Sequence, residues 1–190
     1  MTREEIMDIF TTTGAMLTGH FRLTSGKHSN RYFQCAQVLQ HPRYTEILCS
    51  ELARRFAGQG VATVIGPAMG GIIVSYEVAR ALGARSLFTE RENGKMVLRR
   101  NFNIAPGEKI LVVEDVITTG GSVAEVIEVA RSLGAEVVGV GVLVDRSNGR
   151  SALGVPTESL IEVTVETFEP DHCPLCAQGT PAIKPGSRQV

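Results

Sequence analysis

Short apolar runs alternate with amphipathic stretches over most of the chain. The apolar runs are 61–65, 85–88, 109–113 and 137–144, and the amphipathic stretches between them are 72–82 and 123–133. Runs that are nearly continuous in β-branched residues are typical of strands buried on both faces of a parallel sheet. The strand and helix alternation therefore predicts an α/β fold with a doubly wound core.

The N-terminal part of the chain has a different pattern. Thr2 and Glu5 form a capping-box sequence that predicts a helix over about 3–12, and Pro42 opens a second helix that Gly58 closes. Between these helices, the stretch 20–29 contains glycine and serine and has aromatic residues on both sides. This pattern predicts a short hairpin or hood outside the core.

Composition and charge narrow the class of partner. The chain has 190 residues, 43% hydrophobic, with a formal charge of -1 and a pI near 6.4. A basic footprint for a nucleic-acid backbone is therefore missing, and a small molecule is the expected partner. The sequence also lacks a signal-peptide pattern and an apolar run of the roughly 18 residues that a membrane span needs, so we expect no membrane contact and a cytoplasmic protein.

The segment 114–122 combines two acids with a glycine-rich turn. Thr118, Thr119, Gly120, Gly121 and Ser122 lie between a predicted strand and a predicted helix. Glycines allow a tight turn with inward N–H groups, the hydroxyls add donors, and the helix N-terminus attracts anions. The lysine of a Walker loop is absent. The turn therefore predicts a phosphate cradle, with Glu114 and Asp115 close enough to accept hydrogen bonds from the hydroxyls of an attached sugar.

Two further strand ends carry candidate residues. The stretch 66–71 is glycine-rich and lies between a strand and a helix, which fits a second anion site or a plain tight turn. Asp145 and Arg146 follow the last long core strand, where the arginine fits a ligand carboxylate or a local ion pair. In open α/β sheets, ligands bind at the carboxyl ends of the strands, so the three segments predict one site.

The segment 112–122 resembles the phosphoribosyl-diphosphate signature of the type I phosphoribosyltransferases. Together with 21–29, Tyr32, Phe33 and the Asp145-Arg146 pair, it is similar to the orotate enzymes of that family, over roughly residues 14–150. The resemblance implies one phosphoribosyltransferase domain over 1–190: a parallel sheet flanked by helices as the core, about 41–165, and a small N-terminal hood, about 14–40, with a C-terminal tail, 166–190.

The resemblance also implies an activity. The enzyme would transfer the phosphoribosyl group of 5-phospho-α-D-ribose 1-diphosphate (PRPP) to orotate, giving orotidine 5′-phosphate and diphosphate in pyrimidine (UMP) biosynthesis. The implied PRPP-binding residues are Glu114, Asp115, Val116, Ile117, Thr118, Thr119, Gly120, Gly121, Ser122, Ala68, Met69 and Gly70. The implied orotate-binding residues are Thr118, Arg146, Tyr32 and Phe33. Mg²⁺ would be the cofactor, bound mainly through PRPP and through Asp115 by way of a water molecule.

A mobile loop over 90–95 is implied to close on the site. Its cations Arg91 and Lys95 join Glu114 and Asp115 as implied catalytic residues, and the family uses such a loop across a homodimer interface. Equally, these cations fit a solvated surface hairpin. This chain has Thr24 where family members often have lysine, and its loop is shorter than theirs, so which cation is essential stays open.

Four cysteines are too few for a secreted disulfide scaffold, so we expect free thiols. Cys173 and Cys176 have the spacing of half a zinc knuckle, but a structural zinc needs four ligands and the sequence shows no second pair. Cys35, Cys49 or His172 would complete a set only if the fold brought them there. We therefore expect a surface tail without metal.

Two other functions share these features. One is a purine or xanthine phosphoribosyltransferase with the same ribose site. The other is a regulator that senses PRPP and binds nucleic acid, although such proteins usually carry an added domain or a basic face.

Overall fold

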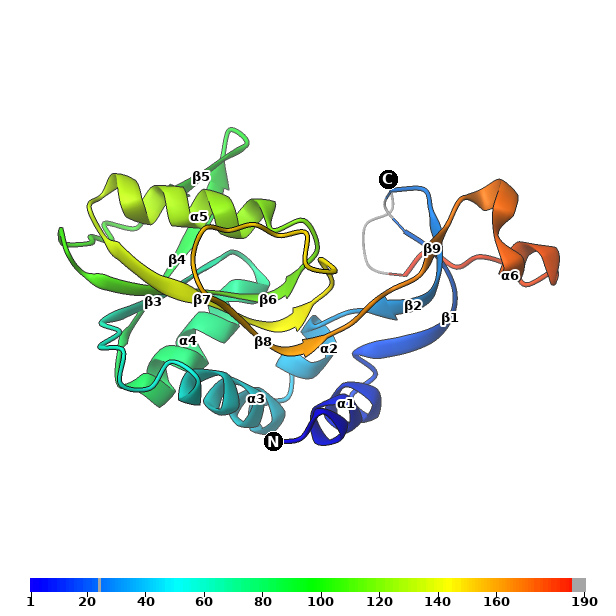
Figure 1. Cartoon of the computed structure of the whole chain (residues 1–190), viewed down its shortest axis with the longest axis horizontal. Coiled ribbons are helices and arrows are strands. Elements are labelled where there is room, and N and C mark those ends of the chain that lie inside the picture. Colours follow the sequence, from blue (N-terminus) through cyan, green and yellow to red (C-terminus); the bar gives the residue numbers. More distant parts are fainter. Residues whose placement is uncertain (24, 186–190) are drawn as a thin grey trace.

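The computed structural model describes residues 1–23 and 25–185, and its larger part is a six-stranded sheet covered by helices (Figure 1). The helices are α1 Arg3–Thr12, α2 Ala36–Leu39, α3 Pro42–Arg54, α4 Gly70–Leu82, α5 Gly121–Ser132 and α6 Pro174–Ala177, with a 3-10 turn at Pro170–His172. The strands are β1 Met16–Arg22, β2 His28–Phe33, β3 Thr63–Pro67, β4 Arg85–Glu92, β5 Lys95–Leu98, β6 Lys109–Ile117, β7 Glu136–Asp145, β8 Thr157–Glu162 and β9 Thr167–Phe168.

The core sheet has the strand order β5-β4-β3-β6-β7-β8, and every neighbouring pair is parallel except β4 and β5. The predicted α/β core is therefore confirmed. The sequence analysis missed β8 because it is an edge strand with only Leu160 and Ile161 fully buried. Two apolar residues are too short a run to signal a strand.

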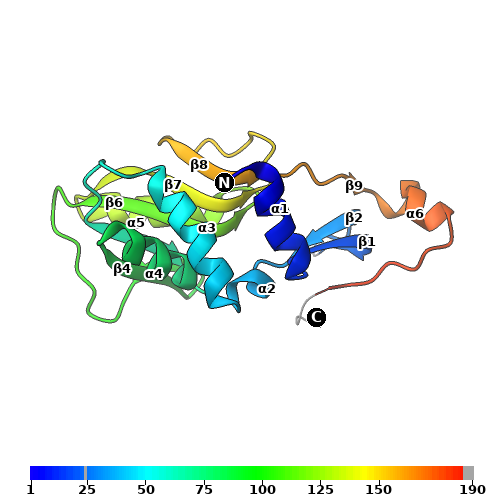
Figure 2. The ribbon, with the colours of Figure 1, turned by 90° about the horizontal axis from the view of Figure 1, so that it is seen from below.

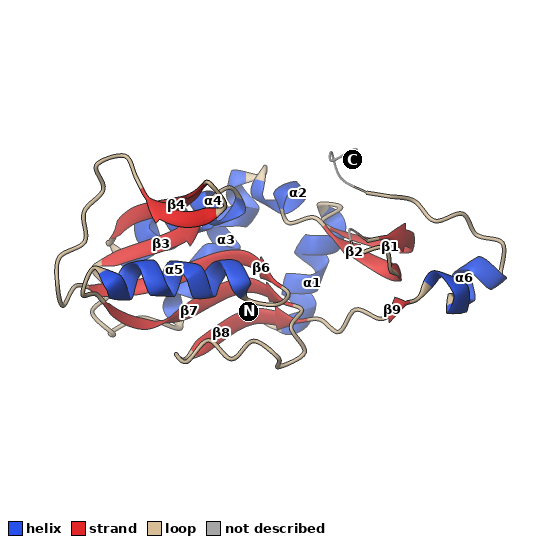
Figure 3. Ribbon diagram, turned by 90° about the horizontal axis from the view of Figure 1, so that it is seen from above, coloured by secondary structure: helices blue, strands red, loops and turns tan. Residues whose placement is uncertain are grey.

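The central strands are buried on both faces because helices cover both faces. Along β6, Leu111 and Val113 pack into the apolar cluster with α3 and α4, whereas Ile110 and Val112 pack into the cluster with α5. This alternation follows from the two-residue repeat of a strand. Figures 2 and 3 show α3 and α4 on one face of the sheet and α5 on the other.

Glycines in β7 make room for a helix side chain. A Cβ atom at Gly139 would lie 3.0 Å from the ring of Phe56, and one at Gly141 would lie 3.1 Å from the same ring. Phe56 follows α3 and is 2% exposed. The Val-Gly-Val-Gly-Val sequence of β7 therefore gives one sheet face to valine packing and leaves the other face open for a bulky aromatic ring.

A second, smaller sheet forms the hood, which we define as β1, β2 and β9 with the tail 166–183. Its strand order is β1-β2-β9, and both pairings are antiparallel. Figure 1 shows this hood beside the core, joined to it by the chain between α1 and β1, the chain after β2 and the chain before β9. The predicted hairpin is confirmed, but α2 packs through Val38 and Leu39 into the core cluster with α1, although it lies inside the range assigned to the hood.

The segment predicted as a mobile loop, 90–95, is largely strand. Residues of β4 and β5 pair antiparallel from Thr89 opposite Leu98 to Glu92 opposite Lys95. Asn93 and Gly94 form the turn, both with positive φ (51° and 79°), which is typical of a tight two-residue hairpin. Among the described residues, no helix is long and apolar enough to cross a membrane.

Candidate active site

Strand β6 carries the two acids inside the sheet rather than after it. The strand continues to Ile117, four residues beyond the predicted end, and Ile117 lies opposite Asp145 of β7. The apolar run ends at Val113, so periodicity alone placed the strand end there. Because Glu114 and Asp115 belong to a paired strand, their backbone is held on one side by β7.

The predicted phosphate cradle, the turn 118–122 between β6 and α5, is an actual pocket. Its volume is about 80 Å³, and its lining residues are Glu114 and 116–123. Gly120 precedes the helix with a φ of 79°, and a Cβ atom there would lie 3.2 Å from Ser151 and Leu153, so both conformation and space require glycine. The first N–H groups of α5 have no partner within the helix, which suits an anion.

The second glycine turn packs directly on the acids. A Cβ atom at Gly70 would lie 2.6 Å from Cγ of Asp115, and one at Gly71 would lie 3.2 Å from Oε1 of Glu114. The preceding Ala68–Met69 peptide bond is cis, and Met69 is 82% exposed. The structure thus brings the turn before α4 and the turn before α5 together around one pair of carboxyl groups.

Glu114 and Asp115, the acidic pair, are largely buried side by side. The N–H of Asp115 donates to Oε1 of Glu114 at 3.1 Å, and the N–H of Val116 donates to Oδ1 of Asp115 at 2.8 Å. Burial, and after it the charge of Asp115, raises the pKa of Glu114, and burial also raises the pKa of Asp115. The free pair therefore retains a proton, and hydroxyl donors or a cation would favour its full ionisation.

Arg146 lies at the end of β7, where its N–H donates to the carbonyl of Ile117 at 2.9 Å. Its guanidinium carbon is 5.9 Å from the ring centre of Phe33. Its Nε atom is buried and has no hydrogen-bond partner within the described structure, and Asp145 accepts from the N–H of Ser147 instead. Within the described part of the chain there is therefore no ion pair between Asp145 and Arg146, and Nε has no hydrogen-bond partner although it is buried.

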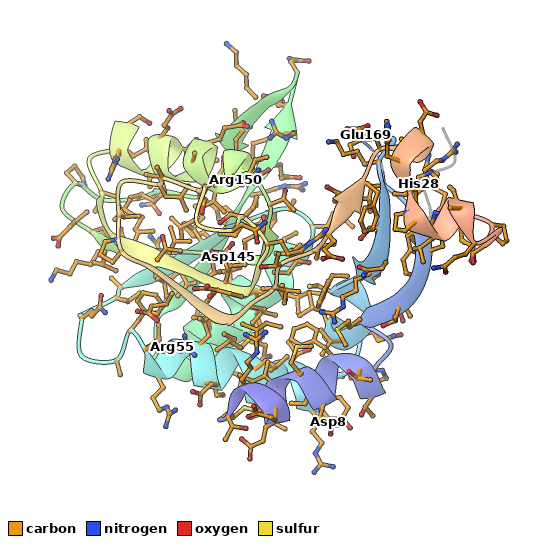
Figure 4. All side chains as sticks on the ribbon, turned by 45° about the vertical axis from the view of Figure 1, so that its right-hand side comes forward. Asp8, His28, Arg55, Asp145, Arg150 and Glu169 are labelled. Atoms are coloured by element: carbon orange, nitrogen blue, oxygen red, sulfur yellow. The ribbon has the colours of Figure 1, made fainter. Side chains whose placement is uncertain are left out.

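The two hood aromatics lie near Arg146 but differ in their surroundings. The sequence predicted that the ring of Phe33 binds orotate. In the structure, Phe33 is 5% exposed and packs edge-on against Phe10 in the core, so its ring supports Arg146 and does not offer a face to a ligand. Tyr32 is half-buried, stacks near Phe21 and donates its hydroxyl to Gln34 at 3.0 Å. Figure 4 shows Asp145 in the core and His28 in the hood, the two parts that meet here.

The cations of the β4–β5 hairpin lie beside α5 rather than over the acidic pair. Arg91 forms an ion pair with Glu125 at 2.7 Å and donates to the carbonyl of Gly94 at 2.7 Å. Lys95 lines a groove with Glu125 and Glu128. Within one chain, the structure does not bring Arg91 or Lys95 to the other predicted catalytic residues.

Other residues of the site escaped the sequence analysis. Cys35 is buried behind the acidic pair, its thiol 3.9 Å from the carbonyl oxygen of Asp115, and burial raises its pKa strongly. Thr89 lies opposite Pro67, and its hydroxyl is the second buried side-chain group without a partner in the described ranges. Its place directly after the apolar run 85–88 was the sequence signal that could have identified Thr89. Thr24 lies outside the described residues.

Comparison with known proteins decides between families. The model of the phosphoribosyl transferase domain family matches residues 36–168. Orotate phosphoribosyltransferases from Desulforamulus reducens and Pelotomaculum thermopropionicum are 80% and 70% identical to this chain, each over 190 residues and 100% of both chains. The chain belongs to the orotate phosphoribosyltransferases.

Solved structures agree with the family. The crystal structure of orotate phosphoribosyltransferase from Aeropyrum pernix aligns with a TM-score of 0.67 at 29% identity, over 83% of this chain and 93% of that chain. An adenine phosphoribosyltransferase from Thermoanaerobacter pseudethanolicus aligns with a TM-score of 0.61 at 16% identity, over 70% and 88%, which shows a shared fold alone. As a member of its family, the chain is a phosphoribosyltransferase of the α/β type predicted from its sequence.

Proposed function

We propose that this orotate phosphoribosyltransferase family member transfers the phosphoribosyl group of PRPP to orotate, giving orotidine 5′-phosphate and diphosphate for UMP synthesis. The observation that carries the proposal is the place of one buried acidic pair between two glycine turns: Gly70 and Gly71 pack on it, and Glu114 lines the pocket of the cradle. A ligand bound there meets two anion-binding turns on either side of two hydrogen-bond acceptors. PRPP has this layout, because its ribose hydroxyls lie between a 5′-phosphate and a 1-diphosphate.

In this proposal, the cradle binds the 5′-phosphate through the backbone from Val116 to Ser122. The hydroxyls of Thr118, Thr119 and Ser122 add donors, and the helix dipole of α5 adds positive potential. Glu114 and Asp115 accept from the ribose hydroxyls, and the turn containing Ala68, Met69 and Gly70 binds the diphosphate. The close approach of Gly70 to Asp115 supports this order along the ligand.

Arg146 is the proposed orotate receptor, with Thr118 beside it. A guanidinium binds a carboxylate or two carbonyl oxygens with parallel hydrogen bonds, and orotate offers both kinds of acceptor. Burial lowers the pKa of Arg146, yet the group remains charged, and in a site with little water its bonds to an anion become stronger. Tyr32 flanks this position, and Phe33 holds the guanidinium from the core side.

The residues also fit a magnesium ion, since hard cations prefer carboxylate and phosphate oxygens and the acidic pair supplies buried carboxylates. Asp115 would hold it through a water molecule, with PRPP as the main ligand. When bound, Mg²⁺ supplies positive charge to the leaving diphosphate. The acidic pair then acts on the sugar side, where its negative charge stabilises the positive charge that builds on the ribose ring during displacement.

We further propose that the enzyme is a cytoplasmic homodimer in which the β4–β5 hairpin acts on the partner's site. Within one chain, Arg91 is held by Glu125 beside α5, and this supports a role for the hairpin outside its own site. The two catalytic cations would stabilise the diphosphate as it leaves. The free thiols support a reducing compartment.

The assay of the proposal follows orotate absorbance in the presence of PRPP and Mg²⁺, with adenine, hypoxanthine and xanthine in parallel reactions. Loss of orotate absorbance, dependent on PRPP, is the expected result. Turnover of a purine alone would overturn the roles of Arg146 and Tyr32. Retarded mobility of an RNA or DNA probe at moderate salt without turnover of any base would instead favour the regulator.

A further inference from the structure

Four potential metal ligands converge in the hood, away from the acidic pair. His20 comes from β1, His28 from β2, and Cys173 and Cys176 from the tail, and their ligand atoms all lie within 4.8 Å of one another. His20, His28 and Cys173 are buried, whereas Cys176 is exposed. His28 lies in the hood beside the tail segment that carries Glu169 (Figure 4).

The distances within this cluster are close to those of a tetrahedral zinc site. Nε2 of His20 is 3.5 Å from Sγ of Cys173 and 3.8 Å from Sγ of Cys176, and Nδ1 of His28 is 3.3 Å from Sγ of Cys176. Zinc bonds of about 2.3 Å to sulfur and about 2.0–2.1 Å to nitrogen place those atoms about 3.6 Å apart in a tetrahedron. The two nitrogens are 2.9 Å apart, so the distance between them would increase by about 0.5 Å when an ion binds.

A backbone carbonyl orients one of the imidazoles for a metal. Nδ1 of His20 lies 2.7 Å from the carbonyl oxygen of Thr180. Since that oxygen only accepts, Nδ1 carries the proton, and the lone pair of Nε2 points at the two sulfurs and at His28. Metal-binding histidines commonly donate their second N–H to such a carbonyl. Thr180 belongs to the same tail as the two cysteines, so one segment supplies two ligands and the group that orients a third.

We propose that His20, His28, Cys173 and Cys176 bind one structural zinc ion that fastens the tail to the β1–β2 hairpin. Two sulfurs and two imidazole nitrogens are a ligand set that zinc prefers. Because the nitrogen and sulfur atoms lie only 3.3–3.8 Å from one another, the space between them holds one ion and is too small for an iron–sulfur cluster. Four protein ligands leave no open position, so the ion would not take part in the chemistry of the acidic pair.

The hood needs such a link because it has little apolar core. Cys173 is the one buried hydrophobic residue within 166–185, and that range contributes no member to the two apolar clusters. The other described attachments include a two-residue ladder of β9, an exposed ion pair between Lys27 and Glu169, side-chain hydrogen bonds from Ser29 and Asn30 to Glu166, and backbone bonds of Ile183 to the hairpin. Small units of this kind commonly depend on a metal or disulfides.

This inference replaces the metal-free tail expected from the sequence. The second pair of ligands is His20 and His28. His20 lies 153 residues before Cys173, and His28 lies 148 residues before Cys176. The other two cysteines and His172 do not belong to this cluster. Cys35 lies behind Asp115, Cys49 lies in the core cluster, and His172 is outside the group.

The first test is metal analysis of the reduced full-length protein, prepared without a histidine tag, loaded with Zn²⁺ and freed of excess by gel filtration. The expected content is about one zinc per chain. Cobalt in place of zinc should give the absorption of tetrahedral Co²⁺ with thiolate ligands. A protein that retains no zinc after loading, or that binds iron instead, would overturn the proposal without any variant.

Variants then locate the ion. Cys176→Ser and His20→Asn should each lower the zinc content at least about tenfold, because four ligands hold the ion. The matched control is His172→Gln, which changes a neighbouring exposed histidine and should retain the metal. Equal zinc in all three variants would contradict this site.

A third measurement reads the proposed role. Removal of zinc with a chelator should expose the tail of the full-length protein to cleavage after Leu175 by chymotrypsin, a serine protease whose catalysis needs no zinc, and added Zn²⁺ should protect the tail again. Cys176→Ser should be cleaved whether or not zinc is present. Tail cleavage that does not respond to zinc in the wild-type protein would rule out the fastening role.

Discussion

The core and the hood of this enzyme are held together by different forces. Two apolar clusters lie on the two faces of the core sheet, and residues such as Leu111 and Ile110 are fully buried in them. The hood has a three-stranded sheet with a polar centre, where His20 and His28 meet the tail cysteines. The core is therefore stabilised by the apolar surface that folding removes from water, whereas the hood depends on the side chains that we propose as zinc ligands.

The difference also divides the proposed function. In the proposal, the core carries the PRPP side of the site, on strand ends and helix starts that the sheet positions. The hood adds Tyr32 at the proposed base side, and Arg146 joins the two parts because it directly follows β7 and lies over Phe33. Changes in the core should thus act on folding and PRPP chemistry, and changes in the hood on the tail and on orotate binding.

The largest expected effect is on the core. Phe56→Ala removes a ring that packs against Gly139 and Gly141 and should lower the free energy of unfolding by about 3–5 kcal/mol, measured by urea titration. The matched hood change is Leu17→Ala, at a residue that is 38% exposed, and it should cost less than about 1 kcal/mol. Equal losses for the two variants would contradict this contrast between a buried core ring and a solvent-facing hood side chain.

Asp115→Asn should have the next largest effect, on turnover rather than on folding. Loss of its charge beside the ribose should lower kcat by about 10²–10³-fold, as measured by the orotate assay. The melting temperature should not fall, because burial already raises the pKa of the carboxyl that is removed. Asp171→Asn in the tail is the control, and an unchanged kcat in Asp115→Asn would contradict its role.

Particular residues show where sequence reasoning succeeds. The acidic pair and the cradle follow one another in the chain, so their composition and their place between a strand and a helix predict a pocket, and the structure has one there. That this pocket binds PRPP stays a prediction. The α/β core was predictable for the same reason, because its signal is a local apolar period.

The failures are long-range or short-run features. His20 and Cys173 lie 153 residues apart, and no local pattern connects them. Phe33 was assigned to the ligand because aromaticity does not reveal burial, and only packing against Phe10 shows its place. The 90–95 segment was assigned as a mobile loop from the family resemblance, whereas the structure has the alternative, a surface hairpin, for which the Asn93-Gly94 pair was the local signal.

Glu114→Gln should have a moderate effect that depends on pH. Since burial raises the pKa of Glu114 in the folded protein, the native carboxyl is protonated where the unfolded one is ionised, and wild-type stability falls as pH rises above the ordinary glutamate value of ~4.3. Glutamine avoids this cost. The variant should therefore exceed the wild type in stability by about 1–2 kcal/mol near pH 8 and match it near pH 4, as measured by denaturant titration.

The control for this pH dependence is Glu128→Gln, at an exposed residue of α5. Its stability should follow that of the wild type at every pH. A Glu114→Gln variant that gains nothing at alkaline pH would show that the acidic pair is ionised in the free enzyme. Ionisation of Glu114 would then cost the folded core no more than ionisation of an exposed carboxyl group.

The smallest expected change in stability comes from Arg91→Ala. Its ion pair with Glu125 is exposed, so the melting temperature should shift by less than about 2 °C, while turnover falls if the hairpin serves the partner's site.

Complementation between two variants tests whether Arg91 acts on the partner's site. Arg91→Ala and Asp115→Asn chains, unfolded and refolded together in equal amounts, form hybrid dimers in half of the cases, each with one site that has both native groups. Such a mixture should recover about a quarter of wild-type activity, whereas refolding either variant alone should recover none beyond its own rate. Recovery limited to the average of the two variants would place Arg91 in the site of its own chain, and the hairpin would then have to leave Glu125 to act.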